Sequence, residues 1–462
     1  MRPPPSGDGS GPGPYARFHD REHHDALGPC LPGGGAGQDE RRPEGDAHGP
    51  AGQHAELHAD VCVIGAGPAG LTLALLLLRS GATVAVAERS RGFTREFRGE
   101  ILQPGGLRVL DDLGVLAAAS GHGAQSHTGF QLVDGRRILL DIDYSRLTGP
   151  HNHLLALNQR HLLTELLHAC RQHPRFTYLS GHRLTSLTTT RERYTAATTR
   201  HAAGHTTVHA RVIVGADGRY SQTRRLAGIR HERMDVFDHD VVWFKLRTSG
   251  PLPRHVRVHR NAGQAFLVHA SHPRTLSVGW TIPHRSWNTL AGQGIEGVKD
   301  RIAGALPAHR RLVHDQLDGL GDLTLLDVFA ARAGTWTAPG LVLIGDAAHT
   351  HSPLGAQGIN LALQDAATLH PHLLDVLGTA QGDPRADELL HRYARQRAPA
   401  VNSVFRFQTA QAKTMLRTSP LADTVRPVLA RLVQHTPLGT HLTHRIAHGR
   451  TPVATRTDLF RP

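Results

Sequence analysis

The stretch from Asp60 to Glu88, DVCVIGAGPAGLTLALLLLRSGATVAVAE, predicts a buried strand, a tight turn, a helix and a second strand in direct succession. Gly65, Gly67 and Gly70 stand in the G-x-G-x-x-G spacing just before the leucine-rich helix. The first glycine permits the tight turn, the second lets a pyrophosphate approach the backbone, and the third lets helix and strand pack closely. This pattern is typical of a nucleotide-binding α/β fold.

Residues on both sides of the turn complete the predicted nucleotide site. Pro68 and Ala69 lie at the start of the helix, where free amides and the helix dipole attract phosphate. Glu88 ends the second strand where an acidic residue that bonds an adenosine ribose is expected, and Arg89 follows it. Together these features predict an adenine dinucleotide, and they leave NAD and FAD equally open.

The chain of 462 residues has a formal charge of +13 that comes almost entirely from arginine, because lysine occurs only at Lys245, Lys299 and Lys413. Such a charge is compatible with nucleic acid or membrane headgroups as partners. Aromatic residues make up only 5%, however, and no basic stretch is interleaved with them. We therefore predict that no nucleic acid is bound and that the arginines are spread over the surface.

Cysteine usage and hydropathy bound the setting of the protein. The three cysteines neither pair evenly nor show metal-ligand spacing, which favours a reducing, cytoplasmic location. The most apolar stretch, residues 71–78, is far shorter than a membrane span, and no signal peptide is visible, so we expect no stable membrane insertion. His349 and His351 are close in sequence, but they fall in a loop with another interpretation, so no metal site is predicted.

Two later apolar strands also end in short turns that contain glycine and aspartate. Residues 212–214 are followed by GADG, which includes Asp217, and residues 341–344 are followed by GDAAH, which includes Asp346. A strand ending in G-x-D-G has many structural explanations when taken alone. Asp346, by contrast, is suited to bond the hydroxyls of a sugar or sugar alcohol.

The segment after GDAAH predicts a loop that can lie against a flat ligand. Pro353, Gly355 and Gly358 belong to this loop, and a helix follows. The amides near Gly358, Ile359 and Asn360 would point the start of that helix at an electron-rich or anionic group.

Polar residues elsewhere are candidates for the same ligand. Arg98 lies in a basic loop after the nucleotide motif, and its planar guanidinium suits phosphate oxygens, although a solvated loop arginine is an equal alternative. Gln159 and Arg160 stand at the start of an amphipathic helix predicted over residues 158–170.

Period-two alternation in residues 117–155 and 231–330 predicts a second, largely antiparallel sheet outside the nucleotide fold. The expected fold class is α/β, with a Rossmann-like dinucleotide domain, an interleaved β substrate domain and a helical C-terminal tail. The predicted segments are a disordered extension at 1–57, the nucleotide domain at 58–116, 156–230 and 331–400, the substrate domain at 117–155 and 231–330, and the tail at 401–462.

GAGPAG, GADG and GDAAH, in this order, resemble the class A flavoprotein monooxygenases, the p-hydroxybenzoate hydroxylase-like family. The resemblance covers residues 58 to 400 and implies FAD as the cofactor. It places the glycine motif and Glu88 at the ADP half, Arg98 at the pyrophosphate, and Gln159 or Arg160 beside the cofactor. It further implies that Asp217 touches FAD indirectly, that Asp346 binds the ribityl chain, and that Pro353, Gly355, Gly358, Ile359 and Asn360 lie beside the isoalloxazine.

The resemblance also implies a reaction. NAD(P)H would reduce the flavin, O₂ would add to give a C4a-hydroperoxide, and the distal oxygen would pass to an aromatic or polyketide-like small molecule. That substrate is expected between the 355–360 loop and the sheet that carries Trp243 and Trp280. No catalytic acid or base can be named, because in this family those residues vary with the substrate.

Other functions remain open on sequence alone. A flavin-dependent reductase of a prenyl or polyene substrate shares the fold. A flavin-dependent halogenase is favoured less, because Val278 stands where its W-x-W-x-I-P motif has the first tryptophan. A flavin-binding regulator without turnover is a third possibility, and the expected assembly is a monomer or a homodimer.

Overall fold

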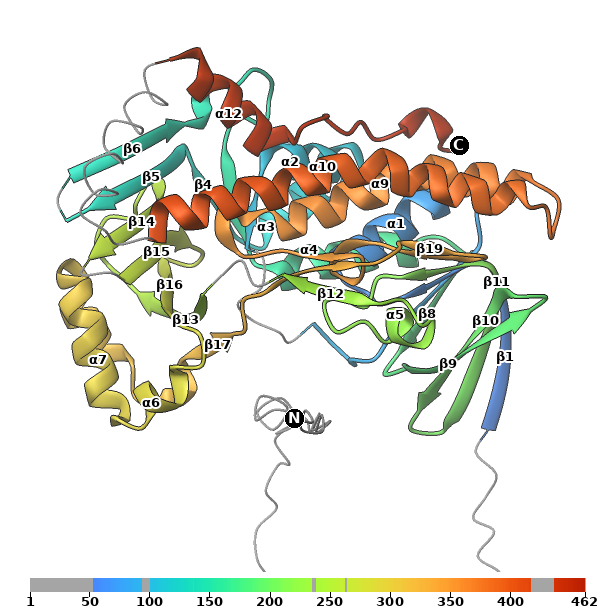
Figure 1. Cartoon of the computed structure of the whole chain (residues 1–462), viewed down its shortest axis with the longest axis horizontal. Coiled ribbons are helices and arrows are strands. Elements are labelled where there is room, and N and C mark those ends of the chain that lie inside the picture. The colour runs from blue at the N-terminus through green and yellow to red at the C-terminus, as the bar shows by residue number, and fades with distance from the viewer. Residues whose placement is uncertain are drawn as a thin grey trace, which may run out of the picture. The chain divides into compact units, whose positions relative to one another are not determined.

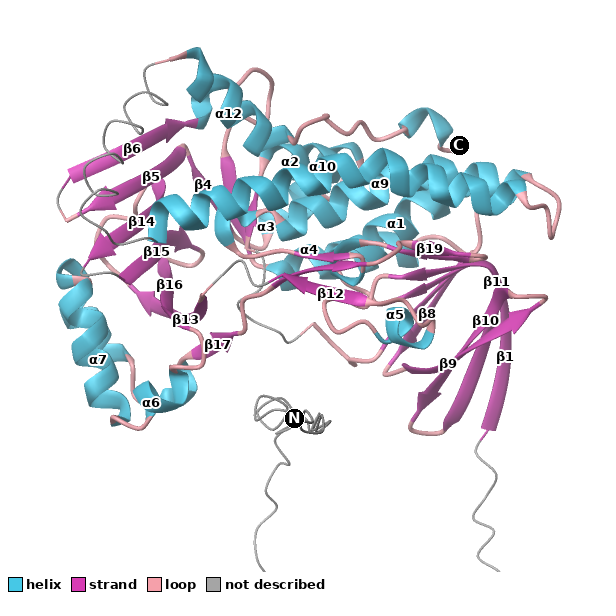
Figure 2. Ribbon diagram, viewed as in Figure 1, coloured by secondary structure: helices cyan, strands magenta, loops and turns pink. Residues whose placement is uncertain are grey.

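The computed structural model describes residues 53–93, 100–135, 137–234, 238–261, 264–416 and 436–461. These residues form a mixed α/β fold with helices at the C-terminal end (Figure 1 and Figure 2), which confirms the predicted fold class. Within these ranges, no helix combines the length and the hydrophobicity that crossing a bilayer requires.

The largest sheet has eight strands and carries the nucleotide motif. Its strands are β1 (Gln53–Ile64), β2 (Val84–Glu88), β8 (Phe176–Ser180), β9 (Arg183–Thr190), β10 (Arg193–His201), β11 (Gly204–Gly215), β19 (Thr337–Ala338) and β20 (Leu341–Leu343). Six of them lie in the order β19-β20-β11-β1-β2-β8, and β10 and β9 branch from β11. β1, β2, β8, β11 and β20 pair in parallel, so the three predicted motif strands end at one edge.

β1 is longer than the motif required. It begins at Gln53, and its first five residues pair with β11, from Gln53 opposite Gly204 to Leu57 opposite Val208. The strand therefore includes residues 53–57, so the prediction that the disordered extension reaches residue 57 is wrong for these five residues.

Four helices pack against one another on one side of this sheet (Figure 1). They are α1 (Pro68–Arg79), α4 (Gln159–Arg171), α9 (Gly358–Gly378) and α10 (Arg385–Leu416). α1 contacts α4 and α9, and α9 contacts α10. Residues 69–78 of α1 are all buried, which explains why this helix is apolar all round rather than along one stripe.

A second sheet of seven strands matches the predicted substrate sheet, in the order β17-β13-β16-β15-β14-β5-β6. These strands are β5 (Gly129–Asp134), β6 (Arg137–Asp143), β13 (His239–Arg247), β14 (His255–Asn261), β15 (Gln264–Ser271), β16 (Thr275–Pro283) and β17 (Thr324–Leu326). All neighbours are antiparallel except β14 and β5, which join the two sequence segments in parallel. Gly135 closes the β5–β6 hairpin with a positive φ of 57°.

Helices cover this sheet on one of its two faces. One face packs on α7 (Gly294–Ala305) and α8 (Arg310–Gln316), in a core that includes Phe244, Phe266 and Trp280. Trp280 is 1% exposed, and its indole Nε1 donates to Gln264 Oε1 at 2.9 Å. Trp280 therefore belongs to the core under the helices, on the opposite face from Trp243.

Smaller elements connect the two main sheets. One three-stranded sheet contains β3 (Ile101–Leu102), β4 (Ala124–His127) and β7 (Leu154–Leu157). Another contains β12 (His231–Met234), β18 (Ala330–Ala333) and β21 (His349–Thr350). The remaining α-helices in the described ranges are α2 (Pro104–Asp112), α3 (Leu116–Gly121), α5 (Gln222–Leu226), α6 (Trp287–Ala291) and α12 (Pro437–His448).

Candidate active site

One cavity of about 400 Å³ runs from the glycine-rich turn after β1 to the seven-stranded sheet. Because β1, β11 and β20 run parallel, their carboxyl ends bring the three motif turns to the same edge. The residues of the predicted cofactor site that line the cavity are Gly65, Gly67, Pro68, Ala69, Glu88, Arg89, Gln159, Arg160, Asp217, Asp346, Pro353, Gly358 and Ile359.

The acidic residue at the end of β2 is tied to the glycine-rich turn. Glu88 accepts hydrogen bonds from the backbone amides of Ala66, at 2.9 Å, and Ser90, also at 2.9 Å. Gly65 adopts a φ of +108°, which a residue with a side chain rarely takes up. The carboxylate is thus fixed beside the turn, and each of its oxygens keeps a second lone pair for a ligand hydroxyl.

Two helix N-termini face the cavity with open space beside them. Neither Gly67, the N-cap of α1, nor Gln357, the N-cap of α9, makes a side-chain capping hydrogen bond. A methyl group at Gly67 or at Gly358 would meet no protein atom within 4 Å. The cavity therefore offers uncapped amides and room at both helix starts, which fits an elongated ligand with a phosphate group.

Gly70 and Asn360 do not line the cavity, but they position the segments around it. A Cβ at Gly70 would lie 2.0 Å from the carbonyl oxygen of Gly65, so this glycine lets α1 pack on the turn. Asn360, 1% exposed, accepts from the Gln103 amide at 2.8 Å and donates to the Ala356 carbonyl at 2.7 Å. The sequence predicted Asn360 as a cofactor contact, whereas its side chain here ties the loop to the strand region beside it.

The loop before α9 has an unusual backbone. Gly355 and Ala356 both have positive φ angles, 74° and 50°, and Gly355 accepts a hydrogen bond from the Gln103 side chain at 3.1 Å. A left-handed alanine costs roughly 1 kcal/mol relative to glycine. Gly355 does not line the cavity, but Pro353 and Ala356 beside it do.

The aspartate of the GADG turn is used by the protein itself. Asp217 accepts hydrogen bonds from the Ser221 hydroxyl and from the amide and hydroxyl of Thr223, at 2.9 and 3.0 Å. These bonds hold the start of α5 against the end of β11. Asp217 thus fixes a turn that forms part of the cavity wall, and its indirect role toward FAD stays a prediction.

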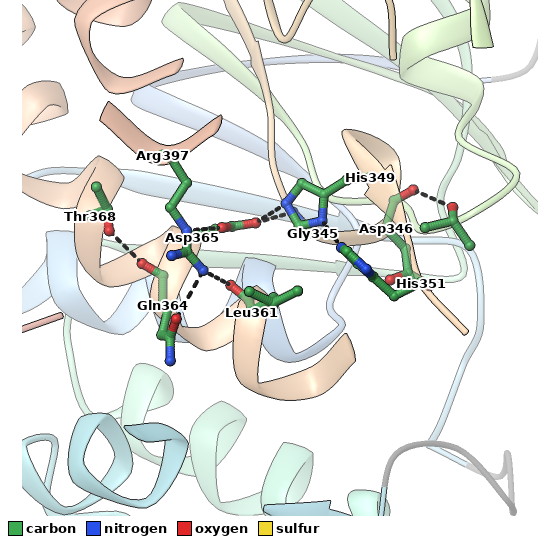
Figure 3. Close-up of polar contacts among 10 residues, drawn as sticks. Gly345, Asp346, His349, His351, Leu361, Gln364, Asp365, Thr368 and Arg397 are labelled. Carbon is green, nitrogen blue, oxygen red and sulfur yellow. Dashed lines mark hydrogen bonds and ion pairs between the residues drawn. The ribbon is translucent and has the colours of Figure 1, made fainter. Parts of the chain in front are cut away.

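Asp346 lies where the GDAAH turn reaches the cavity. Its carboxylate is 31% exposed, and Arg219 Nε lies 3.7 Å from Oδ2. The preceding residue, Gly345, donates its amide to the buried carboxylate of Asp365 at 2.9 Å. Figure 3 shows this anchor beside Asp346.

A buried polar network lies behind this turn (Figure 3). Asp365, 0% exposed, accepts from His349 Nε2 at 2.8 Å and from Arg397 Nε at 2.6 Å. Burial raises the pKa of Asp365, but His349 and Arg397 together lower it to about 2, so the carboxylate is charged. His351 lines the cavity, with its Nε2 3.2 Å from His349 Nδ1, and burial with the nearby His349 holds its pKa well below 6.5.

Arg98, Gln159 and Arg160 are the remaining polar residues that the sequence predicts at the cofactor. Arg98 falls in residues 94–99, outside the described residues. Gln159 and Arg160 begin α4 as predicted, with Asn158 as the N-cap whose Oδ1 accepts from the Arg160 amide at 2.9 Å.

The far end of the cavity contains residues that the sequence did not single out. Glu100, His269 and Ser277 line it together with Trp243 and Leu267. Alternation along β13 and β16 marks which residues share a face, but only the packing of α7 and α8 decides which face meets the cavity.

Comparison with known proteins identifies the fold and the family. Residues 58–408 match the family described as FAD binding domain. A 6-methylpretetramide 4-monooxygenase of Streptomyces rimosus is 47% identical over 403 residues, which cover 87% of this chain and 95% of that protein.

Solved structures agree with the fold. The anhydrotetracycline hydroxylase OxyS of Streptomyces rimosus has a TM-score of 0.69 at 23% identity, over 85% of this chain and 76% of OxyS. The p-nitrophenol 4-monooxygenase PnpA of Pseudomonas putida has a TM-score of 0.71 at 18% identity, over 86% of this chain and all (100%) of PnpA. With the sequence relationship above, this chain belongs to the class A FAD-dependent monooxygenases, the p-hydroxybenzoate hydroxylase-like family.

Proposed function

We propose that this monooxygenase hydroxylates a polycyclic aromatic polyketide of the 6-methylpretetramide type, with NAD(P)H as the reductant. The observation that carries the proposal is the 47% identity to a 6-methylpretetramide 4-monooxygenase over 95% of its length. The family match over residues 58–408 includes the segments that form the seven-stranded sheet as well as the nucleotide motifs, so it extends to both ends of the cavity.

FAD fits the lining of the cavity, and we propose the following positions. The amides at the start of α1, beside Gly67, Pro68 and Ala69, would bind the pyrophosphate, and Glu88 would bind the ribose. Asp346 would bind the ribityl chain, and the start of α9 at Gly358 and Ile359 would face the isoalloxazine. Arg89, Gln159 and Arg160 line the same space as further polar contacts.

Reduced FAD supplies the activation of O₂, and the protein's part is to bind the aromatic ring and exclude water. Ile101, Trp243, Leu267 and Leu326 give the far end of the cavity an apolar surface beside its polar residues. An apolar wall holds a flat aromatic ring and keeps water from the reacting atoms. The described residues contain one β-α-β dinucleotide motif, so we propose that NAD(P)H binds transiently. Assembly as a monomer or homodimer and a cytoplasmic location stay predictions.

Turnover with a defined substrate tests the function. The purified protein should release FAD, and 6-methylpretetramide should stimulate NADPH oxidation and O₂ uptake and yield a product heavier by one oxygen atom. Phenols and naphthoquinones serve as smaller comparison substrates. Substrate-stimulated NADPH use without an oxygenated product would favour a reductase, and turnover that requires chloride would favour a halogenase.

Replacing Asp346 with alanine is expected to weaken FAD binding at least tenfold, because hydrogen bonds to a charged group contribute about 1.5–3 kcal/mol. FAD retained after gel filtration, measured by absorbance against protein, checks this. Asp300→Ala is the matched control, since that side chain is 77% exposed on α7. Full FAD occupancy in Asp346→Ala would mean that the ribityl site lies elsewhere.

A further inference from the structure

Two polar atoms at the far end of the cavity are buried and lack a hydrogen-bond partner among the described residues. They are the acceptor Glu100 Oε2 and the donor Trp243 Nε1. Both residues line the cavity, and Glu100 is only 9% exposed. An unpaired buried polar atom is costly, so such a pair on one cavity wall indicates a ligand that bonds both.

Glu100 is held firmly in this position. Its Oε1 accepts a hydrogen bond from Lys245 Nζ at 2.8 Å, and its backbone carbonyl accepts from the Leu157 amide at 2.8 Å. The Lys245 side chain is 23% exposed and that of Glu100 is 8% exposed, so the ion pair is largely shielded from water. One carboxylate oxygen is therefore occupied by Lys245, and the other, Oε2, lacks a partner among the described residues.

Trp243 is held by the sheet. It lies opposite Gly279 on β16, and a Cβ at Gly279 would come within 2.9 Å of the indole ring. Because Gly279 has no side chain, the indole ring can pack directly against β16. Because Trp243 and Lys245 are two residues apart on β13, both side chains stand on the cavity face.

The neighbouring positions extend this polar row across the sheet. Ser277 lies opposite Lys245 on β16, and His269 lies opposite Ser277 on β15. Burial lowers the pKa of His269, so its ring is uncharged at neutral pH. Among the described residues of this row, the charge is therefore carried by the ion pair of Glu100 and Lys245.

We propose that Glu100 Oε2 accepts a hydrogen bond from an acidic hydroxyl of the aromatic substrate while Trp243 Nε1 donates to a carbonyl oxygen of the same molecule. This inference rests on the proposed function and adds the residues that select and orient the substrate. When a phenolic hydroxyl donates to a carboxylate, the aromatic ring becomes more electron-rich at the carbons ortho and para to that hydroxyl. This favours attack on the ring by an electrophilic oxygen. A site built for this bond also rejects analogues that lack the hydroxyl.

Binding measurements on the FAD-loaded protein test the proposal without turnover. The probes are a monohydroxyanthraquinone and unsubstituted anthraquinone, and their Kd values are measured by calorimetry. Wild-type protein should bind the hydroxyl compound about tenfold or more tightly than the other. Glu100→Gln should remove most of this preference, and Trp243→Phe should weaken both compounds and keep the preference.

FAD content and thermal midpoint of each variant establish that it is folded. Equal binding of the two probes by wild-type protein would overturn the proposal, as would an unchanged preference in folded Glu100→Gln. The wild-type comparison decides the matter even if Glu100→Gln does not fold. A clear preference without any hydroxylated product would instead contradict the proposed function and leave this inference standing.

Discussion

Arg397→Met is expected to lower the free energy of unfolding by about 3–5 kcal/mol, because it leaves a buried carboxylate without its arginine partner. Arg397 is 2% exposed and donates to Asp365 at 2.6 Å and to the Gln364 side chain at 3.0 Å. Methionine fills similar space but neither carries charge nor donates. The substitution should also weaken FAD binding, because Asp365 anchors Gly345 beside Asp346.

The pH dependence of this effect has a defined sign. The pKa of Asp365 is lowered from 3.8 to about 2 in the folded protein, against the opposing effect of burial. The ionised carboxylate therefore stabilises the fold above pH 3.8, and that contribution is lost as the pH falls toward 2. Without Arg397 the carboxyl is protonated more easily, so the deficit of the variant should be largest near neutral pH and should shrink in acid.

Urea unfolding of wild type and variant across pH measures both effects. Arg392→Met is the matched control on the same helix, because Arg392 is 61% exposed and lies 3.7 Å from Glu388. Exposed pairs contribute about 1 kcal/mol or less. A loss below about 1 kcal/mol in Arg397→Met as well would show that the buried pair is not what anchors the turn.

The parts of the fold that depend on local sequence could be predicted. The strand, turn and helix at residues 60–88 and the amphipathic helix predicted over residues 158–170 each have signals within their own segment. The meeting of the three motif turns at one edge of the sheet could also be predicted, since parallel strands end on the same side of a sheet.

The parts that depend on distant pairing could not be predicted. Lys245 and Glu100 are 145 residues apart, and nothing near either residue signals the other. Trp243 and Trp280 both lie on strands of one sheet, yet only packing against α7 and α8 sends Trp280 away from the cavity. The Asp365 network is similar, because its members come from two helices and a turn.

Two single-methyl additions in the first motif should separate folding from FAD binding. Gly70→Ala places a Cβ 2.0 Å from the Gly65 carbonyl, so α1 must move, at an expected cost of about 3 kcal/mol in the free energy of unfolding of the FAD-free protein. Gly67→Ala keeps an allowed backbone, with φ −77° and ψ −176°, and its methyl enters open space. The FAD-free Gly67→Ala protein should therefore lose less than about 1 kcal/mol.

When FAD is added, Gly67→Ala should become the more strongly affected of the two variants, because its methyl group would occupy the space proposed for the pyrophosphate. FAD stabilises the folded state in proportion to the logarithm of its concentration over Kd, so urea unfolding with and without FAD reports both quantities. In Gly67→Ala we expect FAD to bind about tenfold or more weakly, through the loss of hydrogen bonds to a charged group. Wild-type FAD affinity in Gly67→Ala would place the pyrophosphate away from α1. Equal destabilisation of the two FAD-free variants would instead mean that Gly67 is required for packing, as Gly70 is.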